Sequence, residues 1–253
     1  MVDIGLSLTA SDLEQLRQDV IDSCQIIAKE GLFSFCAEGH PSARIPKSNR
    51  FITMGHLHPR GMGMNGVKTI DELVVLDTNM KKIWGKYEVM NEAIIHAAIF
   101  KARPDVGGVV YSHPPYCNAF ANANKPIPRF GTETPVWDSK GAVENPERAA
   151  GMVKALGNKN AILLKDLNSL VTCGDTVKDA VVMVYMIERM AMEDYRSLLI
   201  GMSSQDKTKP PRNPRYPAKD FTYRVDEFGG DVVHFDFWKY LWDKHIARGK
   251  PSI

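Results

Sequence analysis

Five of the seven histidines in this chain of 253 residues lie in its first half. They are His40, His56, His58, His96 and His113. Histidine is the commonest metal ligand, and it is the side chain whose ordinary pKa lies closest to neutral pH. This concentration of imidazoles therefore points to a metal site or to acid–base catalysis.

The spacing of these residues leaves more than one interpretation open. Glu92 stands four residues before His96, so a helix would present both on one face. Such a pair can share a metal, the glutamate can act as a base, or the two can form a solvated pair without function. His113 ends a β-rich run and precedes two prolines, a position from which side chains point into a cleft at the end of a sheet. The sequence His56-Leu57-His58 can chelate a metal or can be polar surface.

The order of the predicted elements mixes hairpins with helices. Predicted strands cover residues 43–46, 50–54, 72–76, 83–84, 106–112, 161–165 and 170–173. Predicted helices cover residues 11–31, 87–102, 145–157, 176–201 and 234–247, and a loop-rich stretch covers residues 126–142. This order predicts an α/β fold with a largely antiparallel sheet.

Polar residues mark where three of these helices begin. Ser11 with Glu14, and Thr176 with Asp179, match the capping-box pattern, in which each side chain bonds the backbone of the other residue. Asn145 precedes a proline in the first helical position, which is typical of a helix start.

The last fifty residues differ from the rest in composition. Residues 207–219 are rich in Pro, Lys and Arg and contain no acidic residue. The final predicted helix carries Phe237, Trp238, Leu241 and Trp242 along one face. We expect residues 1–202 to form one domain, and residues 203–253 to form an arm and a helix that pack on this domain or on a neighbouring subunit. Because an exposed apolar face of this size is rare in monomers, we expect oligomerisation to bury it.

The overall composition argues against several classes of protein. Lys+Arg number 32 and Asp+Glu number 30, so the charge gives no sign of a nucleic-acid partner or a membrane surface. The sequence has no run of apolar residues long enough to span a bilayer, and its start does not resemble a secretory leader. Cys24, Cys36, Cys117 and Cys173 are scattered, which favours reduced thiols in a cytoplasmic protein.

Several motifs together resemble the class II aldolase/adducin family. In the order and spacing of that family the chain has Gly39–Arg44, Phe51–Thr53, Asn91-Glu92, Arg103–Asp105, Val109–Pro115, Leu163-Leu164 and Leu170–Thr172. The resemblance covers about residues 10–200. It implies a three-layer α/β/α domain around a largely antiparallel central sheet, and a homotetramer with active sites between subunits. It also implies a divalent metal held by three histidines, and a helix-borne glutamate that acts as acid and base.

The family's site residues carry over only in part. Glu92 falls at the acid/base position, and His113 falls on the second histidine of the family's H-x-H. Tyr111 takes the place of the first histidine, and Asn168 is the nearest equivalent of the third. The resemblance therefore implies Glu92, His113 and Tyr111 as catalytic residues, with His113 and Asn168 as the remaining candidate metal ligands. A Zn, Mn or Fe ion and a metal-free site both stay open.

The departures from the family's sugar-phosphate aldolases bear on the substrate. Met90 and Asn91 replace two phosphate-binding serines, and His40 replaces an asparagine, so the donors that a phosphate needs are missing. The G-H-x-S and H-P-P motifs resemble the decarboxylase and oxygenase-like branch, whose substrates are unphosphorylated acids. The candidate substrate contacts are His40, Ser42, Arg44, Asn168 and Trp238. Arg44 could instead form an ion pair on its strand, and Trp238 could belong to a core or a subunit interface.

Two classes of function remain. The first is a lyase that cleaves a carbon–carbon bond in a small hydroxylated or keto carboxylic acid, with an oxygenase-like or other metal-independent enzyme as the alternative within this class. The second is a non-catalytic, adducin-like scaffold that binds a partner through an oligomer surface. Retention of Glu92 and His113 together favours an enzyme.

Overall fold

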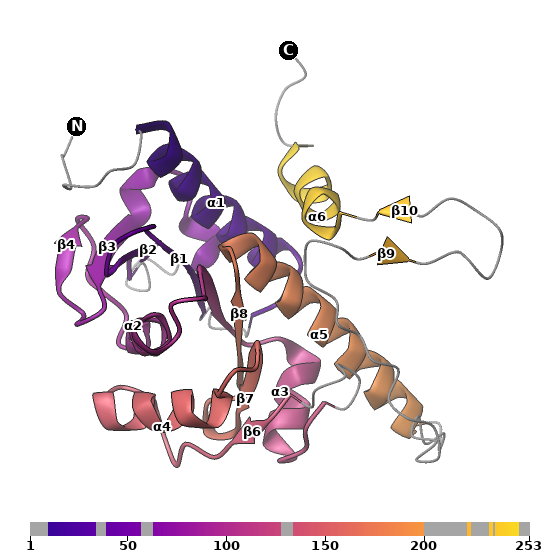
Figure 1. Ribbon diagram of the computed structural model, residues 1–253. Coiled ribbons are helices and arrows are strands. Elements are labelled where there is room, and N and C mark those ends of the chain that lie inside the picture. The colour runs from indigo at the N-terminus through magenta and orange to yellow at the C-terminus, as the bar shows by residue number, and fades with distance from the viewer. Residues whose placement is uncertain are drawn as a thin grey trace.

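An eight-stranded sheet forms the centre of the molecule and lies between two layers of helices (Figure 1). The computed structural model describes residues 10–33, 39–56, 63–127, 134–199, 222–223, 233–234 and 236–247. The strand order is β4-β3-β2-β1-β5-β8-β7-β6. Its strands are β1 (His40–Arg44), β2 (Arg50–Met54), β3 (Leu73–Asp77), β4 (Lys82–Trp84), β5 (Gly108–Ser112), β6 (Val136–Trp137), β7 (Ala161–Leu164) and β8 (Ser169–Gly174). A separate pair joins β9 (Thr222–Tyr223) and β10 (Val233–His234).

The pairing confirms the predicted α/β class and the largely antiparallel sheet. Only β6 and β7 run parallel among the described strands, and all the other neighbours in the eight-stranded sheet are antiparallel. The β1–β2 hairpin forms around the turn that the sequence predicts near Lys47, which adopts a positive φ of 57°. The central strands β1 and β5 are therefore paired on both edges.

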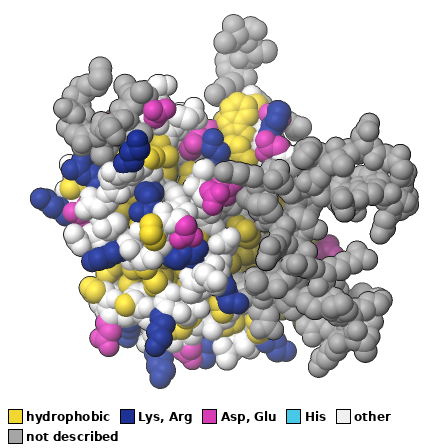
Figure 2. Space-filling model, viewed as in Figure 1, with side chains coloured by type: hydrophobic (Ala, Val, Ile, Leu, Met, Phe, Trp, Pro, Cys, Tyr) yellow, Lys and Arg dark blue, Asp and Glu magenta, His cyan; other side chains and the backbone are white. Residues whose placement is uncertain are grey.

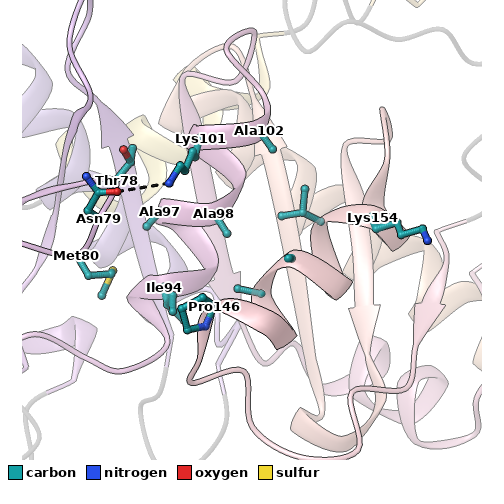
Figure 3. Close-up of a pocket in the computed structure, with 13 residues that line it drawn as sticks. Thr78, Asn79, Met80, Ile94, Ala97, Ala98, Lys101, Ala102, Pro146 and Lys154 are labelled. Atoms are coloured by element: carbon teal, nitrogen blue, oxygen red, sulfur yellow. Dashed lines mark hydrogen bonds between the residues drawn. The ribbon is translucent and has the colours of Figure 1, made fainter.

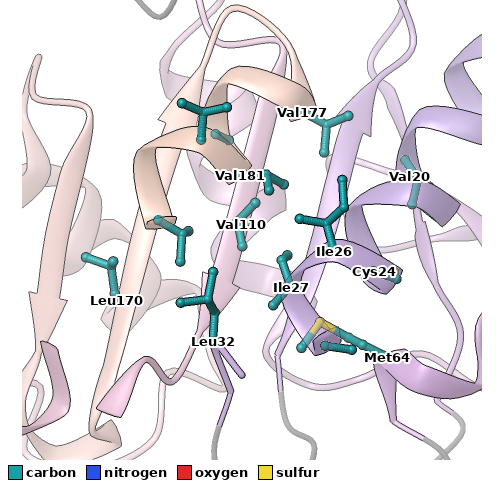
Figure 4. Packing of buried hydrophobic residues seen from close by; sticks show 14 of the residues in the cluster. Val20, Cys24, Ile26, Ile27, Leu32, Met64, Val110, Leu170, Val177 and Val181 are labelled. Carbon is teal, nitrogen blue, oxygen red and sulfur yellow. The ribbon is translucent and has the colours of Figure 1, made fainter. Parts of the chain in front are cut away.

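Helices cover both faces of the sheet, which gives the three layers. The helices are α1 (Ala10–Lys29), α2 (Ala93–Ala102), α3 (Pro115–Asn122), α4 (Pro146–Leu156), α5 (Val177–Leu199) and α6 (Phe237–His245). One apolar cluster joins the sheet to α1, α3, α5 and α6, and the other joins it to α2 and α4. Figure 4 shows the first cluster, where Ile27 of α1 and Val181 of α5 lie near Val110 of β5. Because side chains alternate along a strand, Val109 and Tyr111 of β5 belong to the second cluster.

Helix starts follow the sequence closely at two places. The Asn145 side chain accepts a bond from the amide of Arg148 at the start of α4. Thr176 and Asp179 form the reciprocal bonds of a capping box before α5. At the first helix the prediction is wrong, because α1 begins at Ala10 and Ser11 therefore lies inside it.

Two other element boundaries also differ from those predicted. The helix expected from residue 87 begins at Ala93, since the carbonyl of Glu88 accepts a hydrogen bond from the amide of His56 and not from a following helical turn. His234, expected in the last helix, lies in β10, and α6 starts at Phe237 with Asp236 as its cap. Three short 3-10 turns, Met64–Gly66, Ile70–Glu72 and Lys165–Leu167, complete the described elements.

The apolar face of α6 makes contacts within the chain. Contacts join α6 to α1 and α5, and Leu241 is fully buried. The indole of Trp242 donates to a carboxylate oxygen of Asp22 at 2.8 Å, and Lys244 and His245 both contact Glu30 of α1. Phe237, Trp238 and Trp242 stay half-buried, so burial of the rest of this face by oligomerisation remains a prediction.

Some expectations fall outside the described residues. These are the domain boundary after residue 202, the basic arm at 207–219, Cys36 and His58. The boundary therefore stays a prediction. Cys24, Cys117 and Cys173 are free and buried. None of the helices in the described part of the chain is long and apolar enough to cross a membrane.

Candidate active site

Four aromatic and imidazole rings meet at one end of the central strands. Antiparallel pairing sets His40 of β1 opposite Tyr111 of β5, with ring centroids 5.4 Å apart. The Tyr111 ring meets that of His113 edge-on at 5.0 Å. His96 of α2 lies over His40 with 4.5 Å between ring centroids. The sheet thus brings together three of the five histidines that the sequence singles out, on the face covered by α2 and α4.

The two stacked histidines carry polar atoms that nothing in the described structure satisfies. His40 is 1% exposed and His96 is 0% exposed. Among the described residues, no group forms a hydrogen bond with either ring nitrogen of His40 or with Nε2 of His96. A buried polar atom without a partner costs about 1–3 kcal/mol. Buried polar atoms without a partner are commonly found at sites where a ligand or a water molecule binds.

Burial also sets the charge of this pair. Loss of hydration, followed by repulsion from His113, lowers the pKa of His40 to about 3. Burial and the neighbouring His40 lower the pKa of His96 well below its usual range. Both rings are therefore neutral at pH 7, and each can donate one hydrogen bond and accept another.

Ser42 holds one of these rings in place. Its hydroxyl lies 2.5 Å from Nδ1 of His96 and 3.4 Å from the carbonyl of Val109. Ser42 follows His40 by two residues on β1, so both side chains lie on the same face of the sheet. From the sequence Ser42 is a candidate substrate contact, and the structure places its hydroxyl against His96.

His113 is held from two sides, by Asn168 before β8 and by Asn118 of α3. Its Nδ1 lies 2.8 Å from the main-chain carbonyl of Asn168, and its own carbonyl accepts a bond from the side chain of Asn118 at 3.2 Å. A carbonyl oxygen only accepts, so Nδ1 carries the proton and Nε2 of a neutral ring keeps its lone pair. Asn168 adopts a left-handed backbone (φ 47°, ψ 49°) and is exposed. The main chain of Asn168, and not its amide group, is the part in contact with His113.

Sequence reasoning missed Glu188, which anchors the segment after His113. This carboxylate on α5 is 7% exposed and accepts bonds of 2.9 Å from the amides of both Tyr116 and Cys117 at the start of α3. Burial raises the pKa of Glu188, and these amide bonds oppose that rise. A glutamate in the middle of an apolar helix is the sequence signal that could have identified it.

Ser169 is the second residue that sequence reasoning missed. It is 0% exposed, and its hydroxyl has no partner among the described residues. Tyr111 pairs with Val171, so Ser169, two residues before Val171, lies on the same face of the sheet as Tyr111. Ser169 therefore adds a buried hydroxyl on the face that carries the histidines.

Glu92 stands at the N-cap position of α2, directly before the first helical residue. Its backbone is right-handed helical (φ −68°, ψ −9°), and it is half-buried. The spacing of four residues therefore still places Glu92 and His96 on the same side of the helix.

Two expected substrate contacts lie elsewhere. Arg44, at the far end of β1, is four residues or about 13 Å along the strand from His40. Its guanidinium donates to the carbonyls of Phe100, Arg103 and Val106 at 2.7–2.9 Å. Trp238 lies on α6, and the ammonium of Lys178 is 5.8 Å from its ring centroid. The structure does not place either residue with the histidines.

The side chains of the site do not match the metal that the fold implies. A tetrahedral zinc site takes at least three nitrogen, sulfur or carboxylate ligands from the protein. Within the described ranges no group of three or more His, Cys, Asp or Glu side chains is arranged to hold a metal ion. By the resemblance, Tyr111 and Asn168 take the places of the family's other two histidines, and neither a phenol nor a neutral amide is a usual zinc ligand. These described residues therefore do not fit the metal.

Comparison with known proteins identifies relatives in sequence. The family model described as "Class II Aldolase and Adducin N-terminal domain" matches residues 18–194. The L-ribulose-5-phosphate 4-epimerase UlaF of Salmonella paratyphi B is 30% identical over 120 residues, which cover 47% of this chain and 50% of the relative. The chain thus spans about half the length of that relative. A 3,4-dihydroxyphthalate decarboxylase of Arthrobacter keyseri is 28% identical over 190 residues, or 69% of this chain and 75% of the relative.

Solved structures share the fold at low identity. An L-fuculose 1-phosphate aldolase superposes with a TM-score of 0.68 and 18% identity, covering 80% of this chain and 95% of that one. The L-fuculose 1-phosphate aldolase from Glaciozyma antarctica PI12 gives a TM-score of 0.61 and 22% identity, covering 94% of this chain and 84% of that one. At these identities the likeness confirms the fold class alone.

Proposed function

Because the chain belongs to the class II aldolase and adducin N-terminal domain family, we propose that it is a lyase for a small, unphosphorylated carboxylic acid bearing hydroxyl or keto groups. Loss of carbon dioxide from a hydroxylated aromatic acid is the reaction that we favour. The alignment with the decarboxylase covers 69% of the chain, whereas that with the epimerase covers 47%.

The observation that carries this proposal is the pair of buried, neutral imidazoles His40 and His96, in which both nitrogens of His40 and Nε2 of His96 have no partner among the described residues. Neutral rings suit uncharged substrate oxygens, because His40 can both donate and accept a hydrogen bond and Nε2 of His96 can form one more. Vicinal hydroxyl groups on a planar acid supply donors and acceptors of this kind. The hydroxyl of Ser169 adds a further buried polar atom on the same face.

The catalytic roles follow from the charge that develops when the bond breaks. In a keto acid, the bonding electron pair passes onto the keto oxygen as an enolate when carbon dioxide leaves. In a hydroxylated aromatic acid, the ring carbon that bears the carboxylate takes up the proton first, and the bonding pair then returns to the ring and onto the hydroxyl oxygen as a phenolate. A hydrogen bond from the Tyr111 hydroxyl to that oxygen would stabilise the charge. The lone pair on Nε2 of His113 would accept a hydrogen bond from a substrate hydroxyl and so orient the substrate. Glu92 would deliver a proton to the carbon that carried the carboxylate and regain one from solvent, so that R–COO⁻ and H⁺ become R–H and CO₂. His40, Ser42 and Asn168 would line or support the pocket.

No step in this scheme passes through a metal, because the described donors do not fit one. Whether the purified protein carries a divalent ion such as Zn, Mn or Fe is decided by elemental analysis. The scheme predicts decarboxylation after treatment with a chelator.

We further propose a cytoplasmic homotetramer. The far end of α5 supports self-association, since Leu198 and Leu199 are 59% and 69% exposed. Light scattering at micromolar concentration tests this, and a stable monomer contradicts it.

The direct test of function is a panel assay for carbon dioxide release. Hydroxylated aromatic acids and keto acids are the test compounds, and ribulose and fuculose phosphates are the controls. We expect turnover of at least one unphosphorylated acid and no cleavage of the phosphates, because Met90 and Asn91 replace the phosphate-binding serines. Aldol cleavage of a sugar phosphate, or no turnover of any acid, would contradict the proposal.

A further inference from the structure

A hollow opens on the outer side of α2, away from the histidines. It has a volume of about 580 Å³ and lies between α2, α4 and the turn that joins β3 to β4 (Figure 3). This volume falls within the range of small-molecule sites, which is about 300–1,000 Å³. In Figure 2, hydrophobic side chains interspersed with Lys and Arg are visible on the face where α2 and α4 lie.

The floor of the hollow is apolar and built from small residues. Ala97 and Ala98 of α2 face Ala149 and Ala150 of α4, and Ile94 closes one end. Alanine side chains leave the two helices with a shallow trough between them and offer no hydrogen bonds. The body of a ligand in this trough must therefore be apolar.

The rim of the hollow is cationic. Lys101 of α2 and Lys154 of α4 are both exposed, and none of the thirteen lining residues is acidic. The ammonium of Lys101 bonds only weakly to a neutral amide, the side chain of Asn79, at 3.4 Å. In the part of the chain that the structure describes, no carboxylate pairs with Lys154. Two cations that no carboxylate neutralises thus flank an apolar floor.

The hollow is distinct from the candidate active site. Ile94, Ala97, Ala98 and Lys101 recur at the spacing of one helical stripe, and this stripe forms the wall of the hollow. His96 lies off that stripe, fully buried against His40 on the sheet side. One helix therefore serves two separate sites.

We propose that this hollow binds a small apolar carboxylate, with an aromatic or aliphatic body on the alanine floor and its carboxylate at the rim beside the ammonium of Lys101, while Lys154 adds positive charge on the far side (Figure 3). Charge complementarity selects an anion, and the apolar floor selects against a sugar or an inorganic ion. The site is independent of the proposed lyase reaction.

The test uses 2-naphthoate as the probe and the alanine methyl groups as reporters. In protein labelled with carbon-13 at alanine methyls, titration should shift Ala97, Ala98, Ala149 and Ala150 saturably and leave Ala28 of α1 unchanged. The neutral analogue 2-naphthalenemethanol should bind more weakly, and added salt should weaken 2-naphthoate binding.

Charge-removing variants make the test specific. The double variant Lys101→Met and Lys154→Met keeps the aliphatic stems and should weaken 2-naphthoate binding by about two- to fivefold, as expected for the loss of one exposed ion pair. Lys125→Met, beyond the end of α3, removes one exposed charge elsewhere and should leave the affinity unchanged. His113→Ala should also retain the four methyl shifts, which separates this site from the proposed active site.

Three results would overturn the proposal. The first is equal affinity in the double variant and the wild type. The second is loss of the four methyl shifts in His113→Ala, which would assign the probe to the active site. The third is a change of the same methyl signals with protein concentration alone, which would show that a second copy of the chain covers the hollow.

Discussion

The two ends of β1 carry polar side chains in opposite states. At one end the guanidinium of Arg44 donates to three main-chain carbonyls that close the end of α2 and the turn after it. At the other end His40, which is buried more deeply than the half-buried Arg44, has no hydrogen-bond partner among the described residues for either ring nitrogen. A polar group whose hydrogen bonds are formed stabilises the fold, whereas a buried polar group without hydrogen-bond partners reduces stability unless a ligand binds to it. Within the five residues of β1, this difference distinguishes a structural residue, Arg44, from a candidate ligand-binding residue, His40.

The same contrast distinguishes the surroundings of the two residues. Arg44 also lies over the ring of Phe100, with 4.7 Å between the guanidinium carbon and the ring centroid. His40 instead lies against His96 and Tyr111, which are polar aromatic groups. The Arg44 end is therefore a clamp between sheet and helix, and the His40 end is where we expect substrate.

The largest expected effect is on catalysis at the His40 end. Glu92→Gln keeps the shape of the side chain but removes the proton acceptor, so turnover should fall by about two to four orders of magnitude. Substrate affinity should change much less, because the lost interaction belongs to the transition state. Steady-state kinetics with a substrate from the panel assay measure both effects.

His113→Ala is the companion variant, and it should damage both affinity and turnover. Both variants should keep the wild-type thermal stability. A large loss of stability in both, with ligand binding intact, would instead make Glu92 and His113 structural residues.

At the Arg44 end the expected effect is on stability. Arg44→Met should lower the free energy of unfolding by about 3–4 kcal/mol, because three main-chain carbonyls lose a charged donor. Arg44→Lys should recover only part of this, since an ammonium cannot reproduce the planar fork. Urea denaturation gives the values. If Arg44→Met abolished ligand binding without loss of stability, our assignment of the two ends would be wrong.

How much of this could be read from the sequence differs between the two ends. The hairpin of β1 and β2 was predictable from its alternating apolar residues and its turn, but the strand was expected to start at Ala43. His40 and Pro41 have low strand propensity, and only pairing with Tyr111 and Val110 of the distant β5 extends the strand to them. The meeting of His40 and His96 depends on such long-range pairing.

The candidate site was only partly predictable for the same reason. The resemblance to a known family singles out Glu92, Tyr111 and His113 by local motifs. The choice between clamp and substrate contact for Arg44 depends on carbonyl groups about 60 residues away in the chain. Glu188 was missed because its partners, the amides at the start of α3, lie 71–72 residues before it.

The pH dependence of stability should reveal the buried histidines. An unfolded histidine has a pKa near 6.5, whereas the pKa of His40 in the fold is about 3. Between these values the unfolded chain binds a proton that the folded chain does not, so stability falls as the pH falls from 6.5 towards 3. His40→Asn removes this term and should flatten the curve by about 1.4 kcal/mol per pH unit. Identical slopes between pH 6 and 4 for the variant and the wild type would argue that His40 is charged or exposed.

The smallest expected effect concerns Glu188, which holds the segment after His113 in place. Glu188→Gln keeps one acceptor oxygen and should cost about 1–2 kcal/mol of stability. Because burial raises the pKa of this carboxyl, the wild type should lose stability as the pH rises above 4.5 through the raised value, and the variant should lack this term. Thermal denaturation at pH 4 and pH 7 provides the check. A variant that is more stable than the wild type at both values would contradict the anchoring role.

Nitrogen-15 NMR of the histidine rings tests the central claim most directly, that the unpartnered atoms at the His40 end bind substrate. At pH 7 the rings of His40 and His96 should give the signals of neutral imidazoles. Titration with 3,4-dihydroxybenzoate should then shift both nitrogens of His40 and Nε2 of His96 saturably, while the signals of His245 on α6 stay in place. Charged rings at pH 7, or saturable binding of this compound that leaves the signals of His40 and His96 unmoved, would contradict the account.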